Sequence, residues 1–469
     1  MQKFKGFLMA LLILGGASPL IAWASDGPES VQPTLAADSS STSAIEKRLE
    51  GLEQEIAVLK RQLEVKKEEE GKKTAETPIV TANVKDGFSI KNADESFKLK
   101  LRGYAQTDGR FFFYDKKNLG VNDTFSVRRA RLIFEGTVGK IFDFYIMPDF
   151  GSGASTLVDA YSEIKFSPAL KLKGGKFKVP FALERFQSDS ANNFSEVGLP
   201  SNLAPNREVG FQLSGDLFKE TVNYNVGIFN GSADLASSTG QDTDNNNDKD
   251  VLGRVFVLPF KNKGPEFFKG LGIGLAGSFG HNEGSTIPTY KSTGQASIFS
   301  YSSGVTADGL HARLTPQVSF YNGSLGLLGE YIQSNQKVVR TSGASIIRGT
   351  FENTAWQISG NYVLTGELAT FKGVTPRNNF DLAKGTWGAF DVVARYGHLS
   401  IDNSIFDSGF ASLSSSVSGA DAWGVGANWY LSKNYRISLG FEQTRFDRGA
   451  TVGDRRTEDV VLTRFQVSY

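Results

Sequence analysis

Side chains of two kinds alternate along the chain between Thr124 and Val138. One set of alternate positions holds Ala130, Leu132, Phe134, Gly136 and Val138, and the other holds Arg129, Arg131, Ile133 and Glu135. A period of two residues predicts a β-strand. Two arginines and a glutamate on one face favour a wet lumen on that side and lipid on the apolar side, which is the arrangement of outer-membrane barrels.

The same alternation recurs along the rest of the chain, in segments separated by Gly, Asn, Asp and Ser. The sixteen segments are Lys98–Phe113, Phe125–Val138, Phe142–Phe150, Leu157–Phe166, Leu170–Val179, Glu208–Leu217, Val222–Phe229, Val251–Phe260, Leu271–Gly280, His311–Tyr321, Leu325–Gln333, Ala355–Leu364, Phe390–Leu399, Trp423–Leu431, Tyr435–Phe446 and Val460–Tyr469. An even number of this size is typical of a bacterial barrel that is wide enough for an aqueous channel. The sequence therefore predicts an all-β fold, a transmembrane antiparallel β-barrel of about 16 strands over residues 98–469.

The connections between these segments alternate in length. The short ones are Gly139–Ile141, Ser167–Ala169, Asn322–Ser324 and Ser432–Asn434, and the long ones are Pro180–Arg207, Asn230–Asp250, His281–Leu310, Thr365–Gly388 and Asp402–Ala422. Short turns at one end and long loops at the other are typical of a barrel inserted from the periplasm.

Residues 1–24 have the three parts of a secretory signal peptide. Lys3 and Lys5 come first, Phe7–Leu14 is apolar, and Ala22-Trp23-Ala24 forms a small-x-small cleavage site. An uncleaved membrane anchor is the alternative, but the apolar segment is short and a good cleavage site follows it. The pattern predicts an exported protein, and with the barrel it predicts the outer membrane of a Gram-negative bacterium.

A helical pattern follows a linker over residues 25–43 that is rich in Ser, Ala, Pro and Asp. Apolar residues recur at spacings of four and three, at Ile45, Leu49, Leu52, Ile56, Leu59 and Leu63. This spacing predicts a short N-terminal coiled coil in the periplasm over residues 44–70, and mixed Leu and Ile at both core positions favours three strands. A single amphipathic helix that packs on a periplasmic partner is the alternative. Residues 71–97 are then a second linker and the periplasmic rim of the barrel.

Composition removes several classes of function. The chain has 51 Lys and Arg against 50 Asp and Glu, so its charge gives no indication of a nucleic-acid partner. After the N-terminus no apolar run approaches the roughly 18 residues of a helical membrane span. The absence of Cys excludes disulfides, thiolate metal sites and a lipidated N-terminal cysteine.

The last strand carries an independent signal. Alternate positions up to the final residue hold Val461, Thr463, Phe465, Val467 and Tyr469. This ending resembles the terminal signature that the outer-membrane barrel-assembly machinery reads, although the usual last residue is Phe. We therefore expect that machinery, and outer-membrane lipid, to be partners of the barrel.

Several motifs together resemble the phosphate-selective porin O and P family, over about Gly87–Tyr469. They are LRGY at 101–104, DGRF at 108–111, FSVRRARL at 125–132, GKFKVPF at 175–181, LE at 183–184, VGIFNG at 226–231 and the Asp/Asn-rich run before Lys249-Asp250. The resemblance implies an outer-membrane porin that is a homotrimer of sixteen-stranded barrels, with a constricting loop in each pore. It also implies that small anions such as phosphate pass a ladder of arginines and a lysine cluster.

Strand phase predicts which basic side chains face the lumen. The basic residues expected to line the pore are Arg102, Arg110, Arg129, Arg131, Lys171, Lys173, Arg254, Arg313, Arg395, Arg436 and Arg464, with Lys98, Lys100 and Lys165 on the same face. A bulge at Gly174-Gly175 would also turn Lys176 and Lys178 inward. A column of guanidinium groups can pass an oxyanion along by charge-assisted hydrogen bonds, provided that binding stays weak.

Acidic residues share the predicted lumenal face, and the excess of basic residues is modest. They are Asp108, Glu135, Asp143, Asp149, Asp159, Glu163, Glu330, Asp391 and Glu442. These carboxylates could orient the arginines, or could neutralise them and leave a general or weakly selective pore. A third alternative is that charge pairs only stiffen and hydrate the lumen.

The predicted constriction is the third outer loop, Pro180–Arg207. Its charged residues are Glu184, Arg185, Asp189, Glu196 and Arg207. A loop that folds inward sets the pore diameter and the local field. An ordinary exposed loop is the alternative.

Other motifs point to weaker candidates. Gly272–Gly277 matches GxGxxG without a strand before it or a helix after it, so a glycine-lined strand explains it better than a nucleotide site. A weak calcium candidate comprises Asp242, Asp244, Asn246 and Asp248, but the turn glycine and the bidentate Glu are missing. We expect no cofactor.

Neither an enzyme nor a structural tether fits the sequence as well as a porin. The three His residues are far apart, and GxSxG and HExxH are absent, so no enzyme is predicted. A coiled-coil envelope tether anchored by the barrel is the remaining alternative. About 20 helical residues would reach only roughly 30 Å, which is short for that role.

Overall fold

The computed structural model describes residues 39–76, 78–83, 87–113, 121–153, 155–231, 244 and 246–469. The chain forms two compact units, Met1–Gly71 and Lys72–Tyr469. The predicted signal peptide and the linker up to residue 38 lie outside the described residues. Among the residues that are described, no helix has the length and apolar character needed to cross a membrane.

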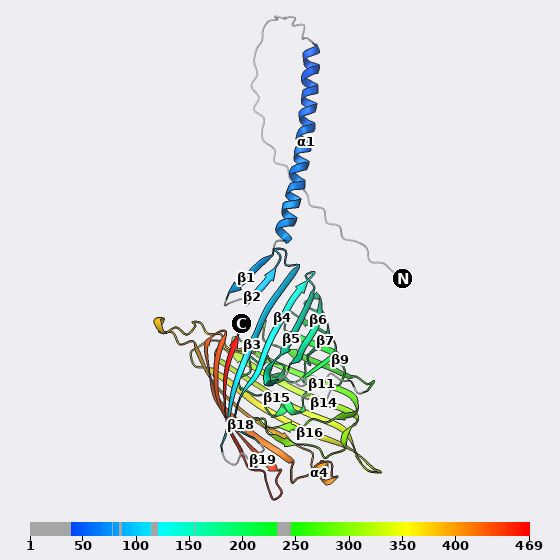
Figure 1. Ribbon diagram of the computed structural model, residues 1–469, viewed down its shortest axis with the longest axis vertical. Helices are drawn as coiled ribbons and strands as arrows, with labels where there is room; N and C mark the ends of the chain where they lie inside the picture. The colour runs from blue at the N-terminus through cyan, green and yellow to red at the C-terminus, as the bar shows by residue number, and fades with distance from the viewer. Residues whose placement is uncertain are drawn as a thin grey trace. The chain divides into compact units, whose positions relative to one another are not determined.

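The N-terminal helix α1 (Ser39–Glu76) has 38 residues and is longer at both ends than the predicted range (Figure 1). At 1.5 Å per residue its length is about 57 Å. The six periodic Ile and Leu side chains between Ile45 and Leu63 are each 52–61% exposed. A single chain therefore leaves this apolar face uncovered, and the coiled coil stays a prediction.

The second unit is a closed antiparallel barrel of sixteen strands, which confirms the predicted fold (Figure 1). The strands are β3 (Phe97–Phe113), β4 (Thr124–Val138), β5 (Phe142–Asp149), β6 (Thr156–Ser167), β7 (Leu170–Lys178), β8 (Arg207–Leu217), β9 (Val222–Phe229), β10 (Asp250–Val257), β11 (Leu271–Thr286), β14 (Val305–Asn322), β15 (Leu325–Ser342), β16 (Ser345–Val363), β17 (Ala389–Ser400), β18 (Val417–Ser432), β19 (Tyr435–Arg448) and β20 (Glu458–Ser468). Each strand pairs with its neighbours in sequence, and β20 pairs with β3 to close the ring. Closure leaves no open sheet edge in the ring, as a membrane requires.

Short elements supplement the ring. β1 (Ile79–Asn83) and β2 (Gly87–Lys91) form a hairpin beside the first part of β3, inside the segment that is predicted to be a linker and the periplasmic rim of the barrel. The remaining elements lie in connections: η1 (Gly151–Gly153), α3 (Leu183–Phe186), η2 (Leu199–Leu203), η4 (Glu266–Phe268), β12 (Tyr290–Lys291), β13 (Ser297–Phe299), η5 (Leu382–Lys384) and α4 (Ser404–Asp407).

The outer wall is apolar between two levels of aromatic rings. Along β11, for example, Ile273, Leu275 and Phe279 are more than half exposed, whereas Ala276 is buried. Ring pairs toward one end include Trp356–Tyr396 and Trp423–Phe441, with centroids 5.5 and 5.4 Å apart. Pairs toward the other end include Phe390–Trp429 and Phe267–Phe320, at 5.5 and 5.2 Å. Aromatic girdles that border an apolar band are typical of membrane barrels.

The final residue helps to close the ring. Tyr469 and Gly103 exchange backbone hydrogen bonds of 2.9 and 3.0 Å. The Tyr469 ring also covers Gly103, where an added Cβ would lie only 2.4 Å from its hydroxyl. Glycine is therefore required opposite the terminal aromatic residue.

The prediction that all long connections share one end is wrong in two places. We call the end with the tight β4–β5 and β6–β7 turns the turn end, and the opposite end the loop end. The 364–388 connection between β16 and β17 lies at the turn end, whereas β15 and β16 join at the loop end by the two residues 343–344. Beyond Gln333 the outward side chains of β15 are polar except for Val339, so strand pairing continues where the apolar pattern stops.

Three loops from the loop end fold inward and build a hydrophobic core inside the ring. They are the β7–β8 loop (179–206), the β11–β14 loop (287–304) and the β17–β18 loop (401–416). Their buried side chains include Phe181, Leu199, Leu203, Phe299, Ile405 and Phe410, packed with Ile332, Val338, Phe351 and Leu399 from the strands. The core therefore lies within the barrel, toward the loop end.

Candidate functional site in the barrel lumen

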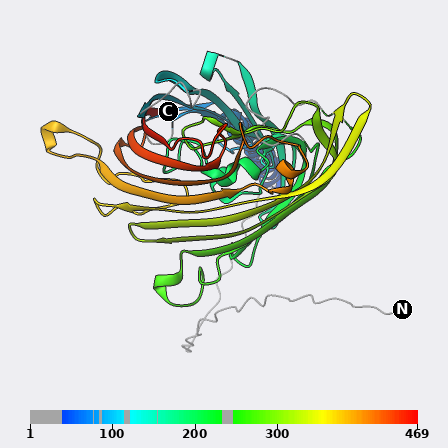
Figure 2. The ribbon, with the colours of Figure 1, turned by 90° about the horizontal axis from the view of Figure 1, so that it is seen from below.

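The β7–β8 loop crosses the interior of the barrel (Figure 2). It leaves the ring after β7 but is hydrogen-bonded to strands far around the ring. These bonds are Leu183 N to Glu330 Oε2 on β15 (2.7 Å), Asn428 Nδ2 on β18 to Asn193 O (3.1 Å), Arg436 Nη1 on β19 to Asn192 O (3.0 Å) and Gln466 Nε2 on β20 to Ser190 O (3.1 Å). The predicted bounds each shift by one residue, because β7 ends at Lys178 and Arg207 is the first residue of β8.

One loop carboxylate, Asp189, lies among four basic side chains of the wall. Arg131 Nη1 is 2.5 Å and Arg129 Nε is 3.5 Å from Asp189 Oδ2, and Arg207 Nη2 is 3.9 Å from the same oxygen. Lys178 Nζ is 3.1 Å from Oδ1. We call these five residues the Asp189 cluster. Burial opposes ionisation of the Asp189 carboxyl, but the four cations outweigh it and hold its pKa well below the usual value.

Lys178 reaches the Asp189 cluster without the predicted bulge. Pairing of β7 with both neighbours is continuous across Gly174-Gly175, so the prediction of a bulge there is wrong. Lys178 is the last residue of β7, and its ammonium also donates to the carbonyl of Gln187 in the loop.

A second loop carboxylate, Glu196, binds three more arginines. Its Oε1 lies 2.9 Å from Arg110 Nη2, 2.6 Å from Arg128 Nε and 3.8 Å from Arg464 Nη2. Burial raises the pKa of Glu196, but Arg128 and the neighbouring arginines lower it further, to a net value far below normal. Arg464 also forms a two-pronged pair with Asp108 at 2.7 and 2.6 Å.

Arg128 is the lumenal residue that sequence reasoning missed. Strict alternation places it on the lipid side, between Val127 and Arg129. In the structure the register shifts here, since Gln106 pairs with Arg129 and Thr107 with Val127. The extra residue in β4 is a bulge that lets consecutive arginines both face inward. Three arginines within four residues were the only signal in the sequence.

The third acidic position of the loop, Glu184, belongs to a network with the far wall. Gln357 Nε2 donates to Glu184 Oε2 at 2.7 Å and to Glu330 Oε1 at 2.8 Å. Arg395 Nη1 is 3.6 Å from Glu184 Oε1, and its Nη2 is 2.6 Å from Glu442 Oε2. The other predicted loop residue, Arg185, donates to Ser201 O within the loop at 2.6 Å.

Most of the eleven basic residues that were predicted to line the pore are buried in the structure. The seven buried residues are Arg129, Arg131, Arg254, Arg313, Arg395, Arg436 and Arg464. The Arg254 guanidinium lies 4.8 Å from the ring centroid of Phe256 in β10 and 5.3 Å from that of Phe186 in the β7–β8 loop. Arg313 pairs with Asp250 at 3.3 Å. Six of these guanidinium groups contact the β7–β8 loop, and Arg313 joins two wall strands, which is a different arrangement from an open column.

The accessible basic side chains form a separate group at the turn end. We call this group the basic rim; it consists of Lys98, Lys100, Arg102, Lys165, Lys171 and Lys173. Its ion pairs are Arg102–Glu135 (2.9 Å), Lys165–Asp143, Lys171–Asp216 (2.9 Å) and Lys173–Glu163 (3.3 Å). Among the described residues, Lys98 and Lys100 have neither an ion-pair partner nor a side-chain hydrogen bond.

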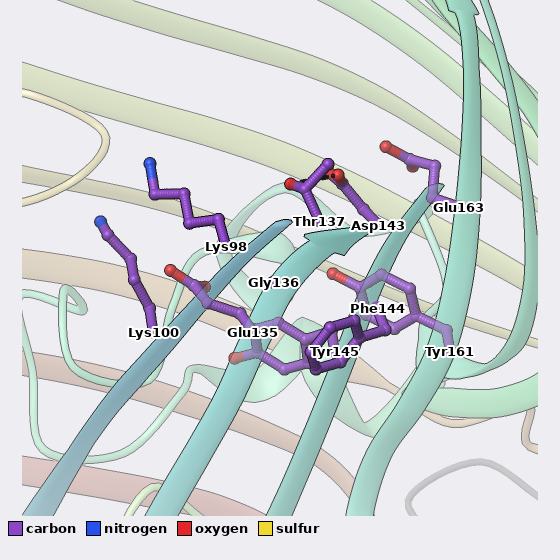
Figure 3. A pocket seen from close by; sticks show the side chains of 10 residues that line it. All are labelled: Lys98, Lys100, Glu135, Gly136, Thr137, Asp143, Phe144, Tyr145, Tyr161 and Glu163. Carbon is purple, nitrogen blue, oxygen red and sulfur yellow. Dashed lines mark hydrogen bonds between the residues drawn. The ribbon is translucent and has the colours of Figure 1, made fainter. Parts of the chain in front are cut away.

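Part of the basic rim opens into a cavity of about 270 Å³ (Figure 3). Lys98 and Lys100 extend from β3 beside Glu135, and Asp143 and Glu163 complete its charged lining. The lining also contains Tyr145 and Tyr161, whose rings stack 5.2 Å apart at an angle of 10°. The sequence named Lys98 and Lys100 as lumenal but did not separate them from the arginines.

The structure bears on the two weaker candidates, the GxGxxG segment and the calcium site. Gly272 and Gly274 lie within β11, where an added Cβ would meet the Phe256 ring at 2.5 Å, so these glycines make room for an aromatic neighbour. In the calcium candidate Asp242 lies outside the described residues, and Asp244 pairs with Lys249 at 2.7 Å. Within the described part of the chain, no group of three or more His, Cys, Asp or Glu residues is placed to hold a metal.

A closed ring of sixteen strands with an apolar outer wall, charged interior and an inward-folded loop defines a porin of the outer membrane. The particular family follows from comparison: the chain belongs to the phosphate-selective porins O and P, whose profile matches residues 97–469. This confirms the resemblance seen in the sequence. As a member of a porin family, the protein is a channel rather than an enzyme.

Individual relatives are distant. Porin O of Pseudomonas aeruginosa is 22% identical over 439 residues, which is 84% of this chain and 94% of the relative. The outer-membrane channel DcaP of Acinetobacter baumannii is 12% identical with a TM-score of 0.52, over 81% of this chain and 99% of that one. OmpT of Vibrio cholerae is 9% identical with a TM-score of 0.51, over 80% and 98%. At these identities the two solved structures support the fold alone.

Proposed function

We propose that the protein lets small anions, with phosphate and polyphosphate-like anions foremost, diffuse passively across the outer membrane. The observation that carries this proposal is the basic rim, where six basic side chains lie with the four carboxylates Glu135, Asp143, Glu163 and Asp216. The excess of two positive charges corresponds to Lys98 and Lys100. The family's description as phosphate-selective supports the choice of anion.

Exposed ammonium groups at a lumen entrance raise the local concentration of anions. The effect extends over about one Debye length, roughly 10 Å in 0.1 M salt. Because an exposed lysine binds an anion weakly, several such groups can exchange it without stopping its passage. The β7–β8 loop sets the pore diameter in this proposal, and the buried arginines hold that loop in place.

The test is a reversal potential in a planar bilayer under a KCl gradient, repeated after phosphate is added. We expect a potential on the anion side, with phosphate reducing the chloride current by competition at the basic rim. A potential on the cation side would overturn the proposal. A near-zero potential without competition would favour the general or weakly selective pore, and a protein with no conductance would favour the coiled-coil tether.

The assembly that we propose is a homotrimer whose α1 helices form a three-stranded coiled coil in the periplasm. The uncovered Ile and Leu positions of α1 support it, because six large apolar side chains that remain more than half exposed favour association. The helix is about 57 Å long rather than the expected 30 Å, so its length no longer argues against a tethering role. A trimer would place three barrels side by side in outer-membrane lipid, after assembly through the C-terminal strand.

The chain has no Cys, so a single Leu52→Cys substitution gives an unambiguous cross-link. We expect rapid disulfide formation between two copies and a detergent-solubilised mass of three chains by light scattering. The exposed polar position Glu53→Cys is the matched control, and equal cross-linking at both positions would contradict the coil. A mass of one chain would instead favour a single helix that packs on another protein.

A further inference from the structure

The Asp189 cluster has the chemistry of an oxyanion site that is already filled. Four cationic side chains from three strands converge on one carboxylate, and its two oxygens take the contacts that a permeating oxyanion would take. Among the described residues, the side chain of Arg129 donates its hydrogen bond to the neutral amide of Gln106, at 2.9 Å. The occupant is part of the protein, because Asp189 is tethered through the β7–β8 loop.

Charge counting shows which cations depend on this carboxylate. Arg131 also pairs with Asp149 at 2.7 Å, and Arg207 pairs with Asp159 at 2.9 Å. Within the described part of the chain, Arg129 and Lys178 have no carboxylate other than Asp189 within 4.0 Å. The four cations of the cluster and the three carboxylates Asp149, Asp159 and Asp189 have together a net charge of +1. Without the Asp189 carboxylate this net charge would be +2.

We propose that Asp189 is a specificity-determining residue that occupies the oxyanion-binding position of the lumen and so prevents this channel from retaining phosphate there. The proposal rests on the lumen being the conducting path proposed above. Side chains of the cluster are 6–15% exposed, so the position is not completely closed to solvent. Phosphate passing the wild-type channel meets cations whose charge Asp189 already balances in part, since this carboxylate accepts hydrogen bonds from Arg131 and Lys178.

The alternative is that Asp189 only anchors the loop, and the two roles predict opposite responses to phosphate. Asp189→Ser removes the charge and opens space for an oxyanion between Arg129 and Lys178. If the position binds oxyanions, chloride current through this variant will acquire a saturable block by inorganic phosphate. If Asp189 is only an anchor, the loop will loosen, and conductance to every ion will rise without such a block.

The experiment titrates inorganic phosphate against chloride current in single channels of four proteins. They are the wild type, Asp189→Ser, Asp189→Glu, which keeps the carboxylate, and Asp216→Ser, which adds the same charge at the basic rim. We expect the half-blocking phosphate concentration to fall about tenfold in Asp189→Ser alone. A higher conductance without block, an unchanged titration, or the same gain in Asp216→Ser would overturn the proposal.

Folding is checked by the heat-dependent shift of the barrel on a denaturing gel. If Asp189→Ser fails to give the folded band while Asp189→Glu gives it, the carboxylate is needed for the loop's placement and the proposal is wrong. The reversal potential of the wild type, measured in the same bilayers, tests the anion preference separately. The wild type could show a potential on the cation side while Asp189→Ser still gains a phosphate block. That result would contradict the proposed anion preference but would support the proposed role of Asp189.

Discussion

The basic rim and the Asp189 cluster both consist of Arg and Lys side chains paired with carboxylates and lie on neighbouring strands, yet they are used differently. Arg102 of the basic rim lies on β3, is 41% exposed and pairs with one carboxylate. Arg131 of the cluster lies on the neighbouring strand β4, is 8% exposed and contacts two carboxylates. The difference comes from the β7–β8 loop, which brings its own carboxylates to the buried positions. Lumenal arginines are therefore a poor measure of anion binding until the loops are placed.

The energetics of the two regions differ for the same reason. An exposed ion pair contributes little, because water and salt screen both partners. In a buried pair each charge has lost its water, so removing one partner leaves the other with a large desolvation cost. Mutations should therefore have large structural effects under the loop and mainly electrostatic effects at the basic rim.

The largest effect should come from Arg464→Ala. Arg464 and Asp108 lie directly opposite each other where β20 closes on β3, and both side chains are only 1% exposed. Removing the guanidinium leaves the Asp108 carboxylate buried, at a cost of about 3–5 kcal/mol. Urea unfolding of the refolded barrel, followed by tryptophan fluorescence, measures this loss.

The control for this prediction replaces both partners with apolar residues of similar size, Arg464→Met with Asp108→Leu. Because no unpaired charge remains, most of the lost free energy of unfolding should return. If Arg464→Ala lowers the free energy of unfolding by less than about 1 kcal/mol, the Arg464–Asp108 pair contributes no more than an exposed ion pair, and the prediction is wrong.

The second largest effect is expected from the double substitution Lys98→Glu with Lys100→Glu, which should change the anion selectivity of the channel. Reversing these two charges, for which the described residues provide no ion pair within 4.0 Å, changes the field at the entrance without burying a charge. We expect the chloride-to-potassium permeability ratio to fall several-fold in 0.1 M salt and much less in 1 M, where the Debye length is about 3 Å. Planar-bilayer reversal potentials measure both.

Lys263→Glu is the matched control for the double reversal. Lys263 is exposed, whereas Lys98 and Lys100 are half-buried, and it lies in the β10–β11 connection at the turn end, away from the charged cavity lining. An equal effect of Lys263→Glu would mean that net charge rather than the basic rim determines selectivity.

The barrel could be predicted from the sequence because each strand carries its own signal. Every lipid-facing residue alternates with a lumenal one, so sixteen strands appear without knowledge of their partners. Two features of the strands depart from this local pattern. Outward side chains of β15 beyond Gln333 are polar except for Val339, and the bulge at Arg128 changes the strand phase within the arginine-rich part of β4.

The site was less predictable, because it depends on contacts between distant parts of the chain. Strand phase placed Arg129 and Arg131 inward, and the loop was recognised as the inward-folding candidate. The sequence could not show that Asp189, 58 residues after Arg131, would lie 2.5 Å from it. The acids were weighed only as neighbours on the wall, so the loop's contribution to neutralising the arginines was missed.

A smaller effect should follow from the Arg102–Glu135 pair at the basic rim. The side chains are 41% and 25% exposed, so a double-mutant cycle with Arg102→Met and Glu135→Gln should give a coupling of about 0.2–1 kcal/mol. Unfolding in urea at two salt concentrations measures the coupling and its screening. A coupling above about 2 kcal/mol, insensitive to salt, would mean that the rim pair is as desolvated as the pairs beneath the loop.

The smallest effect is expected from acidification of the loop between pH 7 and pH 4. The pKa values of Asp189 and Glu196 are lowered in the folded protein, since arginine and lysine neighbours outweigh burial. A carboxyl with a lowered folded pKa contributes stability above its unfolded pKa, near 4, and loses that contribution only as the pH falls toward the folded value. Both carboxylates should therefore stay ionised, and the loop anchored, down to pH 4. A spin label at exposed Ser188→Cys should keep its line shape over this range, and a mobile component with a midpoint between pH 4 and 5 would show that ordinary carboxyls hold the loop.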